Sequence, residues 1–277
     1  MDISWLEILL YGIVSGLTEF LPVSAQAHQT ILLNIFGLEI SHPLMDLFVH
    51  GGMLLAVFVS SGSMIRRVYL EYKVSKLHRR RRKRAPNSQA VLDMRFVKMA
   101  VIPLLLSFLF YQKTGQWSSK LPILIGTLVA NGIILYFPMH LSRANKDSRN
   151  MSSLDGVLFG IGSALSVIPG ISRIGAGTSI AVARGAEPQH TFRWSILLSI
   201  PALAGILFFD VLHLFSVGFN GTNGAFVMKC AIAGICAFCG GYLSISLIKS
   251  FLKRNDFTSF SYYCWGAALF AFILYLY

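Results

Sequence analysis

Long apolar runs decide what this chain can fold into. Six of them reach the about 17 to 25 residues that a helix needs to cross the hydrocarbon core of a bilayer. The chain is 55% hydrophobic and 13% charged, with a mean hydropathy of +0.63, values typical of polytopic membrane proteins and outside the range of soluble domains. We expect a single membrane domain, residues 1–277, with spans at 44–64, 95–111, 121–139, 194–216, 226–248 and 258–277.

Two further apolar segments, 3–38 and 155–183, are interrupted near their middles. The first is broken at Pro22 and the second at Pro169-Gly170, and polar residues gather at each break. Because proline and glycine disfavour the helix interior, we expect each segment to be a helix–loop–helix hairpin. The opening MDISWLEILLYG has no basic region and no small-residue cleavage site, so the first hairpin should remain in the mature protein.

The two broken segments resemble each other. A shift of 148 residues places GIVSGLTEFLPVSAQAHQT over GIGSALSVIPGISRIGAGT without a gap and with six identities. The first half, 1–140, and the second half, 150–277, then each contribute one re-entrant hairpin and three spans. Since three crossings is an odd number, the second half should be inverted in the membrane. We expect an all-α polytopic fold of two inverted repeats, whose broken helices form a site for a polar ligand.

Basic residues predict the orientation of the chain. The formal charge is +12, and 12 of the 24 Lys and Arg lie in the polar segment 66–98, which we expect to be a loop. If this loop is cytoplasmic, 20 of the 24 basic residues lie inside and both termini lie outside, as the positive-inside rule requires. The run HRRRRKR is typical of a cluster that faces anionic lipid, and we favour that over a nucleic-acid patch.

Ionisable residues inside the broken segments are the candidate functional groups. Glu19 and His28 are candidates for acid/base chemistry, and Arg173 in PGISRIGAGTS offers a cationic fork to phosphate oxygens. An ionisable group within a membrane costs about 2.5 kcal/mol or more, which favours function over helix packing. Ser24 and Ser172 fit packing and ligand contact equally well. Glycine-rich turns and helix N-termini also bind phosphate, so we expect an anionic ligand.

These motifs resemble those of the undecaprenyl-pyrophosphate phosphatase family, integral membrane enzymes associated with bacitracin resistance. Residues 15–28, SGLTEFLPVSAQAH, are similar to the family's E-G-x-T-E-F-x-P-[IV]-S-S-[TS]-[AG]-H, and residues 169–175, PGISRIG, to its P-G-x-S-R-S-G. The stretches MDLFVHGGMLLAVFV and FRWSILLSIPALAGI resemble the helices that follow. The likeness implies removal of the terminal phosphate of undecaprenyl diphosphate, a C55 lipid, in a bacterial inner membrane, which regenerates the carrier for cell-wall synthesis.

The resemblance also implies roles for the residues that match the motifs. Glu19, His28 and Arg173 would be catalytic. The substrate-binding residues would be Ser24, Gln26, Gly170, Ser172, Gly175 and Thr178. The ligands of any metal stay unknown, with Mg²⁺ or Ca²⁺ as the expected cations. The expected partners are the polyprenyl diphosphate, membrane lipids and a second copy of the chain, and no nucleic acid.

Four positions depart from the family pattern. They are Ser15 for the first glutamate, Ala25 for the hydroxyl residue often proposed as nucleophile, Gln26 for the next hydroxyl, and Ile174 for the final serine. Alanine cannot form a phosphoseryl intermediate, so hydrolysis would need direct attack by water. Asp46 and Asp210 are the acidic residues in or near apolar segments that are available to replace the lost carboxylate.

Two function classes are compatible with these residues. The first is a phosphatase in which Glu19 and His28 form an acid/base pair and Arg173 stabilises the developing phosphate charge. The second is a catalytically impaired relative that binds or translocates a polyprenyl phosphate lipid. The departures favour the second class, whereas the retained acid/base pair favours the first, because binding alone does not need it. We favour the phosphatase.

Overall fold

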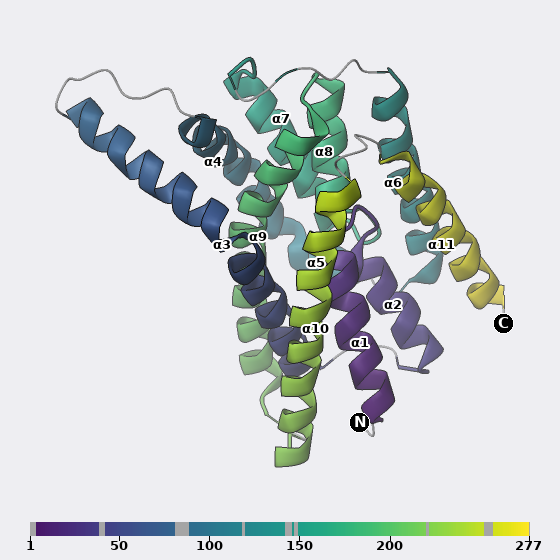
Figure 1. Cartoon of the computed structure of the whole chain (residues 1–277). Coiled ribbons are helices and arrows are strands. Elements are labelled where there is room, and N and C mark those ends of the chain that lie inside the picture. The colour runs from purple at the N-terminus through teal and green to yellow at the C-terminus, as the bar shows by residue number, and fades with distance from the viewer. Residues whose placement is uncertain are drawn as a thin grey trace.

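The computed structural model describes residues 4–38, 42–80, 89–117, 120–141, 146, 149–219, 222–251 and 257–276. In this part of the chain the regular structure is helical, and β-type pairing is limited to one isolated bridge between Lys146 and Ala186. Figure 1 shows a bundle of helices from which α3 (Pro43–Arg80) departs at its C-terminal end. The all-α fold predicted from hydropathy is therefore confirmed.

Five helices in the described ranges are long and apolar enough to cross a membrane. They are α3, α6 (Leu121–Leu141), α9 (Pro188–Val217), α10 (Gly224–Phe251) and α11 (Thr258–Leu276). Their bounds contain or closely match five of the six predicted spans, because a long apolar run is a local signal that can be read without knowledge of the packing. The signal holds even in α6 and α9, which contain the interior prolines Pro138 and Pro201.

The sixth predicted span, 95–111, is not one continuous helix. Instead, α4 (Gln89–Ser107) is followed by the 3₁₀ turn η1 (Phe108–Phe110) and the short helix α5 (Tyr111–Gly115). The hydroxyl of Ser107 donates to the carbonyl of Leu104 at 2.7 Å, where it competes with the hydrogen bonds of the helix itself. Hydropathy does not register this competition, so the sequence-based bounds were wrong here.

The basic segment 66–98 is also more helical than predicted. Helix α3 continues to Arg80 and α4 begins at Gln89; residues 81–88 lie outside the described residues. Arg67 and Glu71, one turn apart, form an ion pair at 2.8 Å. Charged side chains such as these are good helix formers, and a charge run carries no helix-stop signal, so the helix extends past the apolar run.

The two broken segments form hairpins with matching bounds. The first consists of α1 (Trp5–Glu19) and α2 (Ala25–Ile35). The second consists of α7 (Ser153–Ala164), its extension η2 (Leu165–Val167), and α8 (Arg173–Ala183), each bound lying 148 residues after its counterpart. The breaks contain Pro22 and Pro169-Gly170, as predicted.

The hairpins pack against helices of the opposite half of the chain. Helix α1 lies against α10, and α7 lies against α4. A side chain at Gly12 would overlap the carbonyl of Ala233 on α10, and one at Gly160 would overlap the carbonyl of Ala100 on α4. These two glycines are 148 residues apart, and their lack of a side chain allows both close approaches. The inversion of one half relative to the other in the membrane stays a prediction.

Candidate functional site

The two helix breaks contact each other and α6. The hydroxyl of Ser172 donates to the carbonyl of Leu21 at 3.4 Å. Asn131 on α6, which is fully buried, joins both breaks: its Nδ2 donates to the carbonyl of Pro22 at 3.1 Å, and its Oδ1 accepts from the backbone N–H of Ser172 at 2.9 Å. Asn131 is not among the site residues predicted from the sequence, although a lone amide in an apolar span indicates a hydrogen-bonding role.

Ser24 and Ser172 cap the helices that follow the breaks. The Ser24 hydroxyl accepts from the N–H of Ala27 at 3.4 Å, and the Ser172 hydroxyl accepts from the N–H of Gly175 at 3.1 Å. The backbone differs between them, because φ is 68° at Ser24 and −81° at Ser172. A residue with a side chain rarely adopts the left-handed region, so the backbone at Ser24 is strained.

Gly170 and Gly175 let the breaks approach their neighbours. Gly170 has φ +96°, and a side chain there would overlap Thr127 on α6. A Cβ at Gly175 would lie 3.2 Å from the carbonyl oxygen of Pro22. Both residues were predicted to bind substrate, and both have a structural reason to be glycine.

Arg173, the first residue of α8, pairs with Glu19, the last residue of α1. One terminal nitrogen of the guanidinium, Nη2, donates to Glu19 Oε1 at 2.7 Å and to the hydroxyl of Ser199 on α9 at 3.0 Å. Two of the three predicted catalytic residues are therefore in direct contact, across 154 residues of sequence. Ser199 was not predicted, because small hydroxyl residues in spans are common packing residues.

The pair lies inside the protein. Arg173 is 9% exposed, and its Nε is sealed from solvent with no hydrogen-bond partner among the residues that the structure describes. A buried charge is costly unless it is paired, and the carboxylate of Glu19 offsets the charge of the guanidinium. The unpartnered N–H and the position at a helix N-terminus make this a suitable place for an anionic oxygen.

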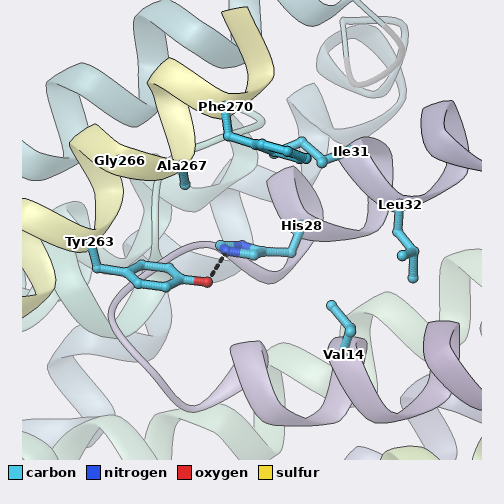
Figure 2. Close-up of a pocket in the computed structure, with 8 residues that line it drawn as sticks. All are labelled: Val14, His28, Ile31, Leu32, Tyr263, Gly266, Ala267 and Phe270. Carbon is cyan, nitrogen blue, oxygen red and sulfur yellow. Dashed lines mark hydrogen bonds between the residues drawn. The ribbon is translucent and has the colours of Figure 1, made fainter. Parts of the chain in front are cut away.

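His28 on α2 belongs to a different set of contacts. Its Nδ1 lies 2.8 Å from the carbonyl of Ser24, and its Nε2 lies 2.9 Å from the hydroxyl of Tyr263 on α11. Both residues line a cavity of about 420 Å³. Figure 2 shows the hydroxyl of Tyr263 directed at the ring of His28. The lining includes neither Glu19 nor Arg173, and no hydrogen bond or ion pair among the described residues joins His28 to them. The other lining residues are Val14, Ile31, Leu32, Gly266, Ala267 and Phe270.

The remaining predicted positions differ in their surroundings. Thr178 is buried and its hydroxyl has no hydrogen-bond partner in the described part of the chain. Gln26 is half-buried. Ser15, which replaces the family's first glutamate, is fully buried and accepts a hydrogen bond from Gln29 Nε2 at 3.0 Å. A polar contact thus persists between α1 and α2 where the carboxylate is missing.

A second group of ionisable residues lies between α1, α3 and α9. The hydroxyl of Tyr11 donates to Asp46 Oδ1 at 2.9 Å, and His50 Nδ1 lies 2.7 Å from Asp210 Oδ2. The side chains of His50 and Asp210 are 15% and 10% exposed. His50 was not predicted, although an ionisable residue within a predicted span is itself a signal.

The described residues do not form a metal site of their own. They contain no group of three or more His, Cys, Asp or Glu side chains arranged to hold a metal ion. Glu19 already pairs with Arg173. Hard cations such as Mg²⁺ and Ca²⁺ require several oxygen ligands, so this donor set does not fit a cation held by the protein alone.

Comparison with curated proteins shows similarity over nearly the full length. The chain is 31% identical over 265 residues to an undecaprenyl-diphosphatase of Alkaliphilus metalliredigens, covering 94% of each protein. It is 30% identical over 279 residues to one of Methanobrevibacter smithii, covering 99% of this chain and 98% of the relative. It is 30% identical over 300 residues to one of Erythrobacter litoralis, covering 97% and 99%.

A family model described as bacitracin resistance protein BacA matches residues 8–270. The match begins within α1 and includes the rest of both hairpins, the Arg173–Glu19 pair and the spans between the hairpins. The family match and the five apolar helices long enough to cross a bilayer identify the chain as an integral membrane protein. The chain therefore belongs to the bacitracin resistance protein BacA family, as its two motifs predict.

Proposed function

We propose that this protein is a membrane-embedded hydrolase that removes the terminal phosphate of undecaprenyl diphosphate and regenerates undecaprenyl phosphate for cell-wall synthesis. The observation that carries the proposal is the buried Arg173–Glu19 pair where the two helix breaks meet. A buried guanidinium at a helix N-terminus suits a phosphate group. Relatives similar over nearly the full length are named undecaprenyl-diphosphatase.

In the proposed reaction, Arg173 holds the terminal phosphate and stabilises the charge that develops on it. Ala25 offers no nucleophile, so water attacks the terminal phosphorus directly. The bond from the water oxygen to phosphorus forms while the bond to the bridging oxygen breaks, and undecaprenyl phosphate leaves. Glu19 and His28 are the motif residues proposed for proton transfer. The substrate-binding residues proposed around them are Ser24, Gln26, Gly170, Ser172, Gly175 and Thr178.

The alternative function is binding or translocation of a polyprenyl phosphate without hydrolysis. Three contacts favour it: Glu19 Oε1 accepts from Arg173, and each ring nitrogen of His28 already has a partner. Undecaprenyl phosphate would still find a cation in Arg173. A carrier needs no proton transfer, so these contacts would not impede it.

Phosphate release by the purified protein from undecaprenyl diphosphate separates the two functions. It should be measured with Mg²⁺, with Ca²⁺ and with a chelator, and beside a triple variant, Ser15→Glu, Ala25→Ser and Gln26→Thr, which restores the family pattern. The phosphatase proposal expects release by the wild type and more release by the triple variant. Binding of undecaprenyl phosphate without release under any condition would replace the phosphatase with the carrier.

We further propose that the halves 1–140 and 150–277 are inverted repeats in a bacterial inner membrane, with both termini outside. The matching hairpin bounds and the exchange of packing partners between halves support the repeat. With this topology, a cysteine-directed reagent added to intact cells should label a cysteine placed at Asn220 and spare one placed at Ser88. The opposite labelling pattern would reverse the orientation.

A further inference from the structure

The ion pair between Arg173 and Glu19 uses only part of each side chain. A guanidinium and a carboxylate frequently form a two-bond pair, in which two parallel hydrogen bonds occupy both carboxylate oxygens. Here Oε1 of Glu19 accepts from one nitrogen of Arg173, Nη2. No hydrogen bond to Oε2 is present in the part of the chain that the structure describes, and the Glu19 side chain is 14% exposed. One carboxylate oxygen therefore stays available.

The second hydrogen on Nη2 goes to Ser199 on α9. Nη2 donates to Glu19 Oε1 at 2.7 Å and to the hydroxyl oxygen of Ser199 at 3.0 Å. These two acceptors come from different helices, α1 and α9. Two bonds in different directions fix the plane of a guanidinium, whereas one bond leaves it free to turn about that contact.

The hydroxyl of Ser199 is itself held in place. The residue is fully buried, and the hydroxyl donates its only hydrogen to the carbonyl of Ser195, one turn earlier on α9, at 2.8 Å. Its oxygen is therefore left to accept, and it accepts from Nη2 of Arg173. Ser199 is thus a fixed acceptor inside the protein, and it sets where the guanidinium points.

The same contact leaves three N–H groups of Arg173 for a ligand. They are the one on Nε and the two on Nη1. Neither nitrogen donates a hydrogen bond to a described residue, and Nε is sealed from solvent. A buried donor without an acceptor is costly, so this arrangement favours a ligand that brings anionic oxygens, such as a phosphate.

We propose that Ser199 is a positioning residue that prevents Arg173 and Glu19 from closing into a two-bond pair; this inference rests on the proposed function. With the pair held open, Arg173 binds the terminal phosphate and Oε2 of Glu19 accepts the proton of the attacking water. The proton moves as the water oxygen bonds to phosphorus and the bridging P–O bond breaks, and it returns to solvent after the products leave. Without the hydroxyl, the guanidinium turns toward Glu19 and takes both carboxylate oxygens.

The test measures the affinity for undecaprenyl phosphate and kcat for phosphate release in wild type, Ser199→Ala and a control, Ser261→Ala. Ser199→Ala should weaken binding roughly 3- to 10-fold, as for the loss of one hydrogen bond. It should lower kcat at least about tenfold, because Oε2 of Glu19 is occupied. Ser261 on α11 is also fully buried, and its hydroxyl has no partner among the described residues, so Ser261→Ala should match the wild type.

The Glu19→Gln background separates positioning from a purely structural role. Glutamine has a single side-chain oxygen, so it cannot form the two-bond pair with Arg173. Adding Ser199→Ala to Glu19→Gln should therefore change the affinity by less than about twofold. A structural defect would lower the affinity equally in both backgrounds, and that result overturns the positioning role.

Binding and turnover distinguish this inference from the function on which it rests. If the wild type binds undecaprenyl phosphate but releases no phosphate, the proposed hydrolysis fails, and the affinities alone decide whether Ser199 positions Arg173. If the wild type releases phosphate and Ser199→Ala equals it in affinity and kcat, the role of Ser199 fails while the proposed function stands.

Discussion

The hairpins α1–α2 and α7–α8 have the same bounds, 148 residues apart, yet they place different side chains at their breaks. The positions they share include the serine caps, Ser24 and Ser172, whose hydroxyls hold backbone N–H groups. The positions where they differ carry the charge. Glu19 in the first hairpin corresponds to a valine in the second, and Arg173 in the second corresponds to an alanine in the first.

The two halves therefore share the features that form a hairpin and differ in those that form the candidate site. The shared features are a serine cap and a break in the helix. The candidate site needs opposite charges facing each other, and a symmetric pair of identical residues would provide like charges, which repel. Each half therefore supplies the group that the other lacks, and the Arg173–Glu19 contact at 2.7 Å is the result.

Arg173→Ala should have the largest effect, because it removes the cation that the second hairpin contributes. Charged hydrogen bonds are worth about 1.5 to 3 kcal/mol, so affinity for undecaprenyl phosphate should fall by roughly 10- to 150-fold. Phosphate release should be abolished. Arg67→Ala, at an exposed arginine of α3, is the control and should bind normally. Unchanged affinity of Arg173→Ala would show that the charge contributed by the second hairpin does not bind the phosphate.

Glu19→Gln removes the charge that the first hairpin contributes while it keeps the side-chain shape. Phosphate release should fall by about 10²- to 10⁴-fold if Glu19 takes part in proton transfer. Binding of undecaprenyl phosphate should be retained, because Arg173 is intact. The same split between rate and binding is expected for His28→Ala. A variant that binds less but turns over normally would assign Glu19 to binding.

Asn131→Leu tests the link between the hairpins. It leaves the carbonyl of Pro22 and the N–H of Ser172 buried without their partner, at a cost of about 1 to 3 kcal/mol for each group. The midpoint of thermal unfolding in detergent should drop by several degrees. Asn34→Leu, an exposed amide on α2, serves as the control. Equal midpoints for the two variants would argue against a structural link.

The smallest expected effect is a difference in stability between glycine variants of the two caps, Ser24 and Ser172. Ser24 has φ 68°, which glycine adopts without strain, so Ser24→Gly should be neutral or slightly stabilising. Ser172 has an ordinary extended backbone, and Ser172→Gly should cost a few tenths of a kcal/mol through the lost cap. Unfolding midpoints of both variants, measured side by side, give the difference. Equal losses would mean that the strain at Ser24 is negligible.

The sequence by itself determined the helices, the breaks and most of the candidate groups. Apolar runs, proline and glycine act on their own neighbours, which is why five spans and both breaks lie where the pattern predicts. Glu19, His28 and Arg173 were identified for a similar reason: an ionisable residue in an apolar segment is visible without knowing its partner. The end of α4 and the continuation of α3 were missed, because side-chain hydrogen bonds and helix propensity shift helix ends beyond what hydropathy reports.

Only the tertiary structure decided which of these groups meet. The sequence shows Glu19, Asp46 and Asp210 as acidic residues in or near apolar segments, and packing pairs Arg173 with Glu19 and His50 with Asp210. It also turned His28 toward Tyr263 and placed Asn131 between the breaks. The physical reason is range: a hydrogen bond acts over about 3 Å, so its partners, here 154 or 160 residues apart in sequence, are set by how the helices pack.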